Sequence, residues 1–156
     1  MSIRLLESGD YELIAPLVDE WWGGRPVRQL LPRLFFEHFQ PTSFAMLEGN
    51  MLQGFLVGFR SQSQSHVSYI HFVGAAPQCR GKGYGRQLYT HFFDTVTSLG
   101  CSEVQCITSP VNTASIAFHH HMGFDIISKD GEQNGVPVTF NHAGEGQHRV
   151  VFRKLL

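Results

Sequence analysis

The chain has 156 residues, of which 42% are hydrophobic and 16% charged, the composition of an ordinary globular protein. This length predicts a single domain over residues 1–156. A net charge of -1 argues against a broad nucleic-acid-binding surface, and no apolar run is long enough to cross a bilayer. The three cysteines lack metal-ligand spacing, which predicts free thiols and no metal site. The absence of a signal-peptide core, together with free thiols, predicts a cytoplasmic location.

Two helices are expected near the N-terminus, after a short strand at residues 3–6. The first covers residues 11–22, where apolar side chains recur at helical spacing. The second covers residues 26–38 and contains Pro32, which is unfavourable inside a helix.

From residue 43 the apolar pattern changes to that of strands. Residues 44–48 and 51–59 predict a hairpin around a Gly49-Asn50 turn. Residues 66–73 predict a third antiparallel strand.

The second half of the chain alternates helices and strands. The expected elements are a helix closed by Gly100, a strand at 103–108, a helix at 112–122, a strand at 124–127, a polar excursion at 129–147 and a final strand at 149–155. Such alternation implies right-handed crossovers and parallel pairing. The predicted fold is therefore α/β with a mixed sheet, antiparallel in its N-terminal half and parallel in its C-terminal half.

A glycine turn, residues 80–85, separates the two halves. Gly81, Gly83 and Gly85 permit positive φ and a close approach to the backbone, and the next helix would present unpaired N–H groups. With Arg80 and Lys82 they predict a cradle for phosphate or pyrophosphate. The spacing fits neither a Walker loop nor a dinucleotide fingerprint. A tight turn without a ligand is the plain alternative.

Two motifs together resemble the GCN5-related N-acetyltransferase (GNAT) family. Residues 78–83, Gln-Cys-Arg-Gly-Lys-Gly, match the family pattern Gln/Arg-x-x-Gly-x-Gly/Ala. Further along, Asn112, Ser115 and Phe118 in a predicted helix closed by Gly123-Phe124 resemble its second motif. The order of the predicted elements is also similar to that of the family.

The resemblance implies the acyl-CoA N-acyltransferase fold, in which acetyl-CoA, the co-substrate, lies in a V-shaped opening between two splayed parallel strands. The pyrophosphate would bind the backbone N–H groups from Arg80 to Gly85. Phe72, Val73 and Gly74 would pair with the pantetheine arm, and one of their N–H groups would polarise the thioester carbonyl. The other cofactor-binding positions that it implies are Gln78, Cys79, Gly81, Lys82, Gly83, Tyr84, Asn112, Ser115 and Phe118. Asn112 would contact pantetheine, and Phe118 would line the side of the site that binds CoA.

Two histidines are the catalytic candidates. His119 stands where the family usually has a tyrosine that acts as general acid. It could donate a proton to the departing sulfur or merely fill the space. His71, on the strand before the glycine turn, is a candidate base, because no carboxylate stands on that strand. A buried structural histidine is the alternative for His71.

The predicted function is acetyl transfer from acetyl-CoA to a primary amine by direct attack. The acceptor is expected to be a small-molecule or peptide amine, without a nucleic-acid or membrane partner, and a homodimer is left open. A non-catalytic acyl-CoA-binding or sensing domain of the same fold is the alternative. A nucleotide-binding α/β protein is a third, weaker one.

Overall fold

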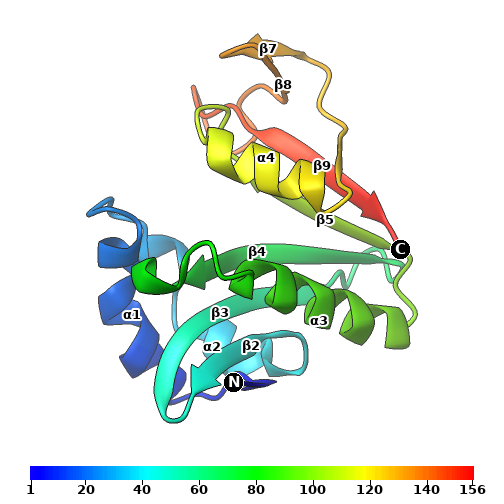
Figure 1. The fold of residues 1–156 in the computed structure, drawn as a ribbon. Helices are drawn as coiled ribbons and strands as arrows, with labels where there is room; N and C mark the ends of the chain where they lie inside the picture. The colour runs from blue at the N-terminus through cyan, green and yellow to red at the C-terminus, as the bar shows by residue number, and fades with distance from the viewer. The chain divides into compact units, whose positions relative to one another are not determined.

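The computed structural model describes residues 1–156, which form nine strands and four helices (Figure 1). The strands are β1 (Ser2–Leu5), β2 (Phe44–Glu48), β3 (Met51–Arg60), β4 (Val67–Ala75), β5 (Glu103–Thr108), β6 (Asp125–Ile126), β7 (Gly131–Gln133), β8 (Val136–Val138) and β9 (Val150–Leu155). The helices are α1 (Asp10–Trp21), α2 (Leu34–His38), α3 (Tyr84–Ser98) and α4 (Thr113–His121). Seven strands form one sheet in the order β1-β2-β3-β4-β5-β9-β6, and β7 and β8 form a separate hairpin. The expected mixed α/β fold is confirmed.

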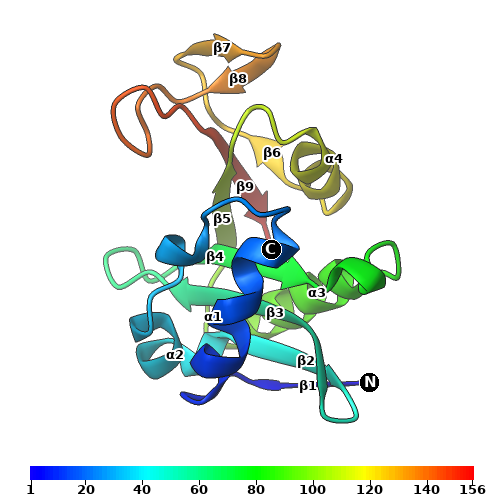
Figure 2. The same ribbon diagram turned by 90° about the vertical axis from the view of Figure 1, so that its left-hand side faces the viewer.

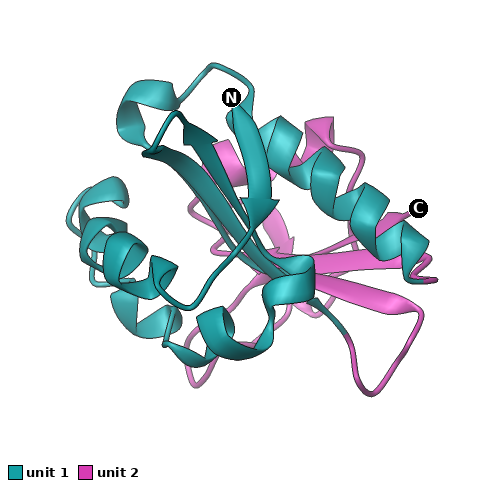
Figure 3. Ribbon diagram, turned by 90° about the horizontal axis from the view of Figure 1, so that it is seen from below, with its two compact units in different colours: residues 1–60, 70–99 teal, residues 61–69, 100–156 magenta.

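The chain forms two units, coloured separately in Figure 3. Unit 1 contains residues 1–60 and 70–99, and unit 2 contains residues 61–69 and 100–156. Strand β4 contributes to both, because its first three residues belong to unit 2 and the rest to unit 1. The single domain expected from chain length stays a prediction.

Unit 1 is built around β3, which lies between α1 and α3 (Figures 1 and 2). Consecutive residues of this strand are buried, so both of its faces are covered. On one face, a Cβ added to Gly54 would lie 3.3 Å from Leu88 of α3. On the other, the ring of Phe55 lies 6.2 Å from that of Trp21 in α1. Because successive strand residues point to opposite faces, α1 and α3 cover opposite sides of this strand. The predicted hairpin β2–β3 is confirmed.

The expected second helix is shorter than predicted. Residues 26–38 form a 3-10 turn, Arg28–Leu30, and the five-residue α2, Leu34–His38, instead of one helix. Pro32 lies between them and disfavours helical backbone at the residue before it, and Leu31 has φ -129° and ψ 60°.

Unit 2 contains the parallel part of the sheet, and this part is smaller than predicted. β5 pairs in parallel with β4 only from Val67 to Tyr69, but pairs antiparallel with β9 along its whole length. β9 also pairs antiparallel with β6. The expected parallel half is therefore limited to β4 and β5, because the last strand inserts between β5 and β6. The excursion at residues 129–147 includes the β7–β8 hairpin and returns the chain for this insertion.

Candidate active site

The glycine turn lies in unit 1 and joins a 3-10 turn, Pro77–Cys79, to α3. Gly81 has φ +83° and Gly83 has φ +79°, both in the left-handed region. A Cβ at either position would meet no atom within 4 Å. Backbone conformation, and not crowding, therefore favours glycine at both positions. Helix α3 begins directly after Gly83.

The start of α3 leaves a row of backbone N–H groups without acceptors in the protein. They belong to Gly81, Gly83, Tyr84, Gly85 and Arg86. No side chain caps this helix. The N–H groups of Arg80 and Lys82, which were expected to bind the ligand too, turn back to the carbonyls of Pro77 and Cys79 at 3.4 and 3.3 Å. Unpaired amides at the positive end of a helix suit an anion.

The side chains around the turn have different surroundings. Gln78 and Lys82 are exposed, and Lys82 forms no ion pair. Arg80 reaches back and donates from Nη2 to the carbonyl of Trp21, the last residue of α1. Lys82 is therefore the cation of the turn that has no partner within the protein.

The three cysteines are free thiols, as predicted, and the structure buries all of them. Cys79, within the turn region, donates from Sγ to Oε1 of Gln53 at 2.5 Å and packs in the unit 1 core. Burial raises the pKa of the Cys106 thiol, so this group stays protonated.

The end of β4 carries the residues expected to pair with pantetheine. Phe72 is half-buried, with its ring 4.7 Å from that of Trp22, and Val73 is also half-buried. At Gly74, an added Cβ would lie 2.6 Å from Trp22 Cη2 and 2.9 Å from Phe55 Cε1. Glycine is therefore required here by close packing, unlike at Gly81 and Gly83.

His71 lies on the same strand and is held from two sides. Its Nε2 lies 2.6 Å from the Leu30 carbonyl, and its ring stacks on Phe35 at 4.3 Å. Since a carbonyl can only accept, Nε2 carries the proton and Nδ1 keeps a lone pair when the ring is neutral. Burial lowers the pKa of His71, and the Leu30 carbonyl offsets this only in part. The neutral ring is therefore the form present at pH 7.

The other predicted site residues lie in unit 2, on or beside α4. Asn112 caps this helix, because its Oδ1 accepts the Ser115 N–H at 3.1 Å. Ser115 and Phe118 are half-buried on the helix. The expected roles of these three residues toward pantetheine stay predictions.

His119 is 5% exposed and lies in an aromatic cluster. Its ring stacks on Phe152 at 4.7 Å and meets the edges of Phe118 and Phe124. Its Nδ1 lies 2.7 Å from the Ser115 carbonyl, so the neutral ring carries its proton there. Burial lowers the pKa of His119, and the Ser115 carbonyl only partly offsets this. An acid role would require a second proton, which burial opposes.

A family model described as the acetyltransferase (GNAT) family matches residues 9–124. The chain belongs to this family. Sequence alone finds no significant match among curated proteins. The family assignment agrees with the two motifs, which both lie within the matched residues.

Solved structures of acetyltransferases share the fold of this GNAT chain. One is yncA from Salmonella typhimurium, assigned as an acetyltransferase and solved with its cofactor acetyl-CoA (20% identity, 100% of this chain and 94% of that chain, TM-score 0.71). Another is a ribosomal-protein-alanine N-acetyltransferase from Brucella melitensis (17% identity, 100% of both chains, TM-score 0.70). A third is aminoglycoside 6'-acetyltransferase type Ii (15% identity, 99% of this chain and 97% of that chain, TM-score 0.74). No helix of the chain has the length and apolar character of a bilayer-spanning segment.

The GNAT pattern also fits the sequence two residues further on. Arg80-x-x-Gly83-x-Gly85 satisfies it as well as the register starting at Gln78 does. In this second register both pattern glycines border the helix start, with Gly83 before the first residue of α3 and Gly85 in its first turn. The unpaired amides favour this register, which the sequence alone also allows.

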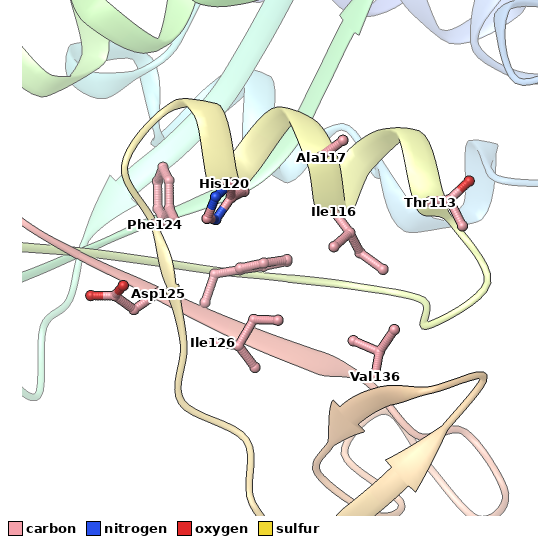
Figure 4. A pocket seen from close by; sticks show the side chains of 9 residues that line it. Thr113, Ile116, Ala117, His120, Phe124, Asp125, Ile126 and Val136 are labelled. Carbon is pink, nitrogen blue, oxygen red and sulfur yellow. The ribbon is translucent and has the colours of Figure 1, made fainter.

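A cavity of ≈ 450 Å³ lies within unit 2 of this GNAT chain and includes none of the predicted site residues (Figure 4). Ile116 and His120 face it from α4, Ile126 from β6 and Val136 from β8. Its walls are mainly apolar. The sequence did not indicate it, because its lining comes from segments that only the tertiary fold brings together.

Proposed function

We propose that this GNAT chain transfers the acetyl group of acetyl-CoA to a primary amine. The observation that carries the proposal is the row of five unpaired N–H groups at the start of α3. Family membership supports it, as does the presence of acetyl-CoA in the related yncA structure.

The chain's own groups would hold the co-substrate at two places in unit 1. The amides of the glycine turn, with the unpaired Lys82 side chain, would bind the pyrophosphate. The backbone from Phe72 to Gly74 would pair with the pantetheine arm, and one of its N–H groups would polarise the thioester carbonyl. The residues present fit the ligand, because a Cβ at Gly81 or Gly83 would meet no atom and four of the six amides of the turn lack acceptors.

The reaction needs a proton acceptor as well as a polarised carbonyl. The amine nitrogen attacks the carbonyl carbon, the C–S bond then breaks, and the sulfur leaves with its electron pair. The nitrogen must lose a proton in this process. Neutral His71 is the proposed base, because Nδ1 keeps a lone pair while Nε2–H is held by the Leu30 carbonyl.

The acceptor class is proposed as a small-molecule or peptide amine. The similar structures include enzymes named for an aminoglycoside and for the alanine of a ribosomal protein, so both kinds of amine occur on this fold. The chain's net charge of -1 favours neither kind.

The test combines binding with turnover. Calorimetry with acetyl-CoA is expected to show one site, and a panel of small amines and short peptides with free N-termini should produce CoA thiol with at least one member. Binding without thiol release from any member would favour an acyl-CoA sensor. Absence of binding would reject both functions.

A further inference from the structure

The guanidinium of Arg80 closes the C-terminal end of α1. Most carbonyls at this end accept a hydrogen bond from a backbone N–H group, namely those of Val18, Asp19, Glu20 and Trp22. The carbonyl of Trp21 has no backbone donor, and Arg80 supplies the missing hydrogen bond. A cation at this end of a helix is also favoured by the helix dipole.

The end of α1 that Arg80 holds carries both tryptophans of the chain. Trp21 is buried against Phe55 in the core of unit 1. Trp22 lies against Phe72 and over Gly74, where its Cη2 atom leaves no room for a Cβ. The Arg80 side chain thus links the glycine turn to the two tryptophans, of which Trp22 packs over the end of β4.

We propose that Arg80 is a positioning residue and not a phosphate ligand. It holds Trp21 and Trp22 so that Trp22 stays packed on the segment from Phe72 to Gly74. Lys82 is then the cation of the turn that acts on the phosphates. This inference rests on the proposed function for its catalytic consequence, but the anchoring of α1 is a property of the protein without ligand.

Tryptophan fluorescence of the unliganded protein tests the anchor directly, because both tryptophans lie at this junction. Arg80→Met removes the donor and keeps an unbranched side chain, Arg80→Lys keeps a charged donor, and Lys82→Met is the matched control in the same turn. We expect a red-shifted emission and stronger acrylamide quenching in Arg80→Met, partial recovery in Arg80→Lys and no change in Lys82→Met. A spectrum of Arg80→Met identical to that of the wild type would overturn the anchor.

Binding and kinetics separate positioning from phosphate binding. We expect the acetyl-CoA Kd to rise by about threefold or less in Arg80→Met and by about tenfold in Lys82→Met, since a hydrogen bond from a cation to a phosphate is about twice as strong as a neutral one. With the amine that releases thiol fastest, kcat of Arg80→Met should fall by about tenfold. A larger loss of acetyl-CoA affinity in Arg80→Met than in Lys82→Met would overturn the proposal. If the wild type binds no acetyl-CoA, the proposed function fails, while the fluorescence of the unliganded variants still decides the anchor.

Discussion

The starts of α3 and α4 solve the same structural problem in opposite ways. Each helix begins with N–H groups that have no partner within the helix. At α4, the Asn112 side chain accepts one of them. At α3, Gly83 has no side chain to do so, and the neighbouring amides stay unpaired. The start of α3 therefore leaves N–H groups available for a ligand, whereas at the start of α4 the Asn112 side chain accepts one of them.

The two candidate histidines differ in a similar way. Each donates from one ring nitrogen to a backbone carbonyl, and each stacks on a phenylalanine. His119 is enclosed by three aromatic rings, while His71 is half-buried on the strand that leads to the glycine turn. Its greater exposure favours His71 as the proposed base, and the enclosure of His119 favours a structural role.

The largest expected effect on activity is that of replacing His71, and it would distinguish His71 from His119. His71→Gln removes the proposed base, so kcat/KM should fall by about 100-fold. The wild type should lose activity below about pH 6.5, where His71, whose pKa is lowered, becomes protonated and can no longer accept a proton. This acid limb of the pH profile should be absent from His71→Gln. Steady-state thiol release from pH 5 to pH 9 measures both. A variant as active as the wild type, with the same acid limb, would remove His71 from the mechanism.

The next largest effect is expected on acetyl-CoA binding at the start of α3. Gly83→Asn and Gly83→Asp have side chains of equal size, and both residue types tolerate the left-handed backbone better than most. The aspartate should weaken acetyl-CoA binding at least about tenfold more than the asparagine does, because its charge repels a phosphate. Calorimetry at two salt concentrations measures the difference. Equal affinities would place the phosphates away from this turn.

At the start of α4 the expected effect is on stability. Asn112→Ala removes the cap and should lower the free energy of unfolding by about 1 kcal/mol. Asn112→Asp keeps an oxygen acceptor and serves as the matched control. Urea denaturation measures both variants. A contact between Asn112 and pantetheine would have a separate effect. Asn112→Asp retains the cap, so weaker acetyl-CoA binding in this variant would support that contact.

The smallest effect should follow replacement of His119 by phenylalanine. We expect kcat to change by less than about threefold and the stability at pH 8 to fall by less than about 1 kcal/mol, the net worth of one hydrogen bond. In the wild type, a folded-state pKa below the unfolded value of about 6.5 means that protonation favours unfolding, so stability is lost as the pH falls below 6.5.

This pH-dependent loss should be smaller in His119→Phe, and urea midpoints at pH 5, 6.5 and 8 would measure it. His71, whose pKa is also lowered, remains in the variant and accounts for part of the residual loss. A tenfold fall in kcat would instead support the acid role of His119.

Much of the fold could be predicted because its signals are local. The β2–β3 hairpin follows from alternating apolar residues around Gly49-Asn50, and the end of α4 follows from Gly123. Pro32 is unfavourable inside the single helix that the apolar spacing predicts, and the structure breaks the helix at this residue. The position of β9 was not predictable in this way, because strand order depends on contacts between distant residues.

The sequence by itself determined that a glycine turn opens a helix after a strand, since the conformations open to glycine and the spacing of apolar residues are local properties. It also carried the paired motifs of the family. Only the tertiary structure decided that Arg80 turns toward α1, that Trp22 covers Gly74 and that aromatic rings enclose His119. The reason is that the partner of a long side chain depends on which carbonyls and rings the fold brings within reach, and no local pattern specifies these.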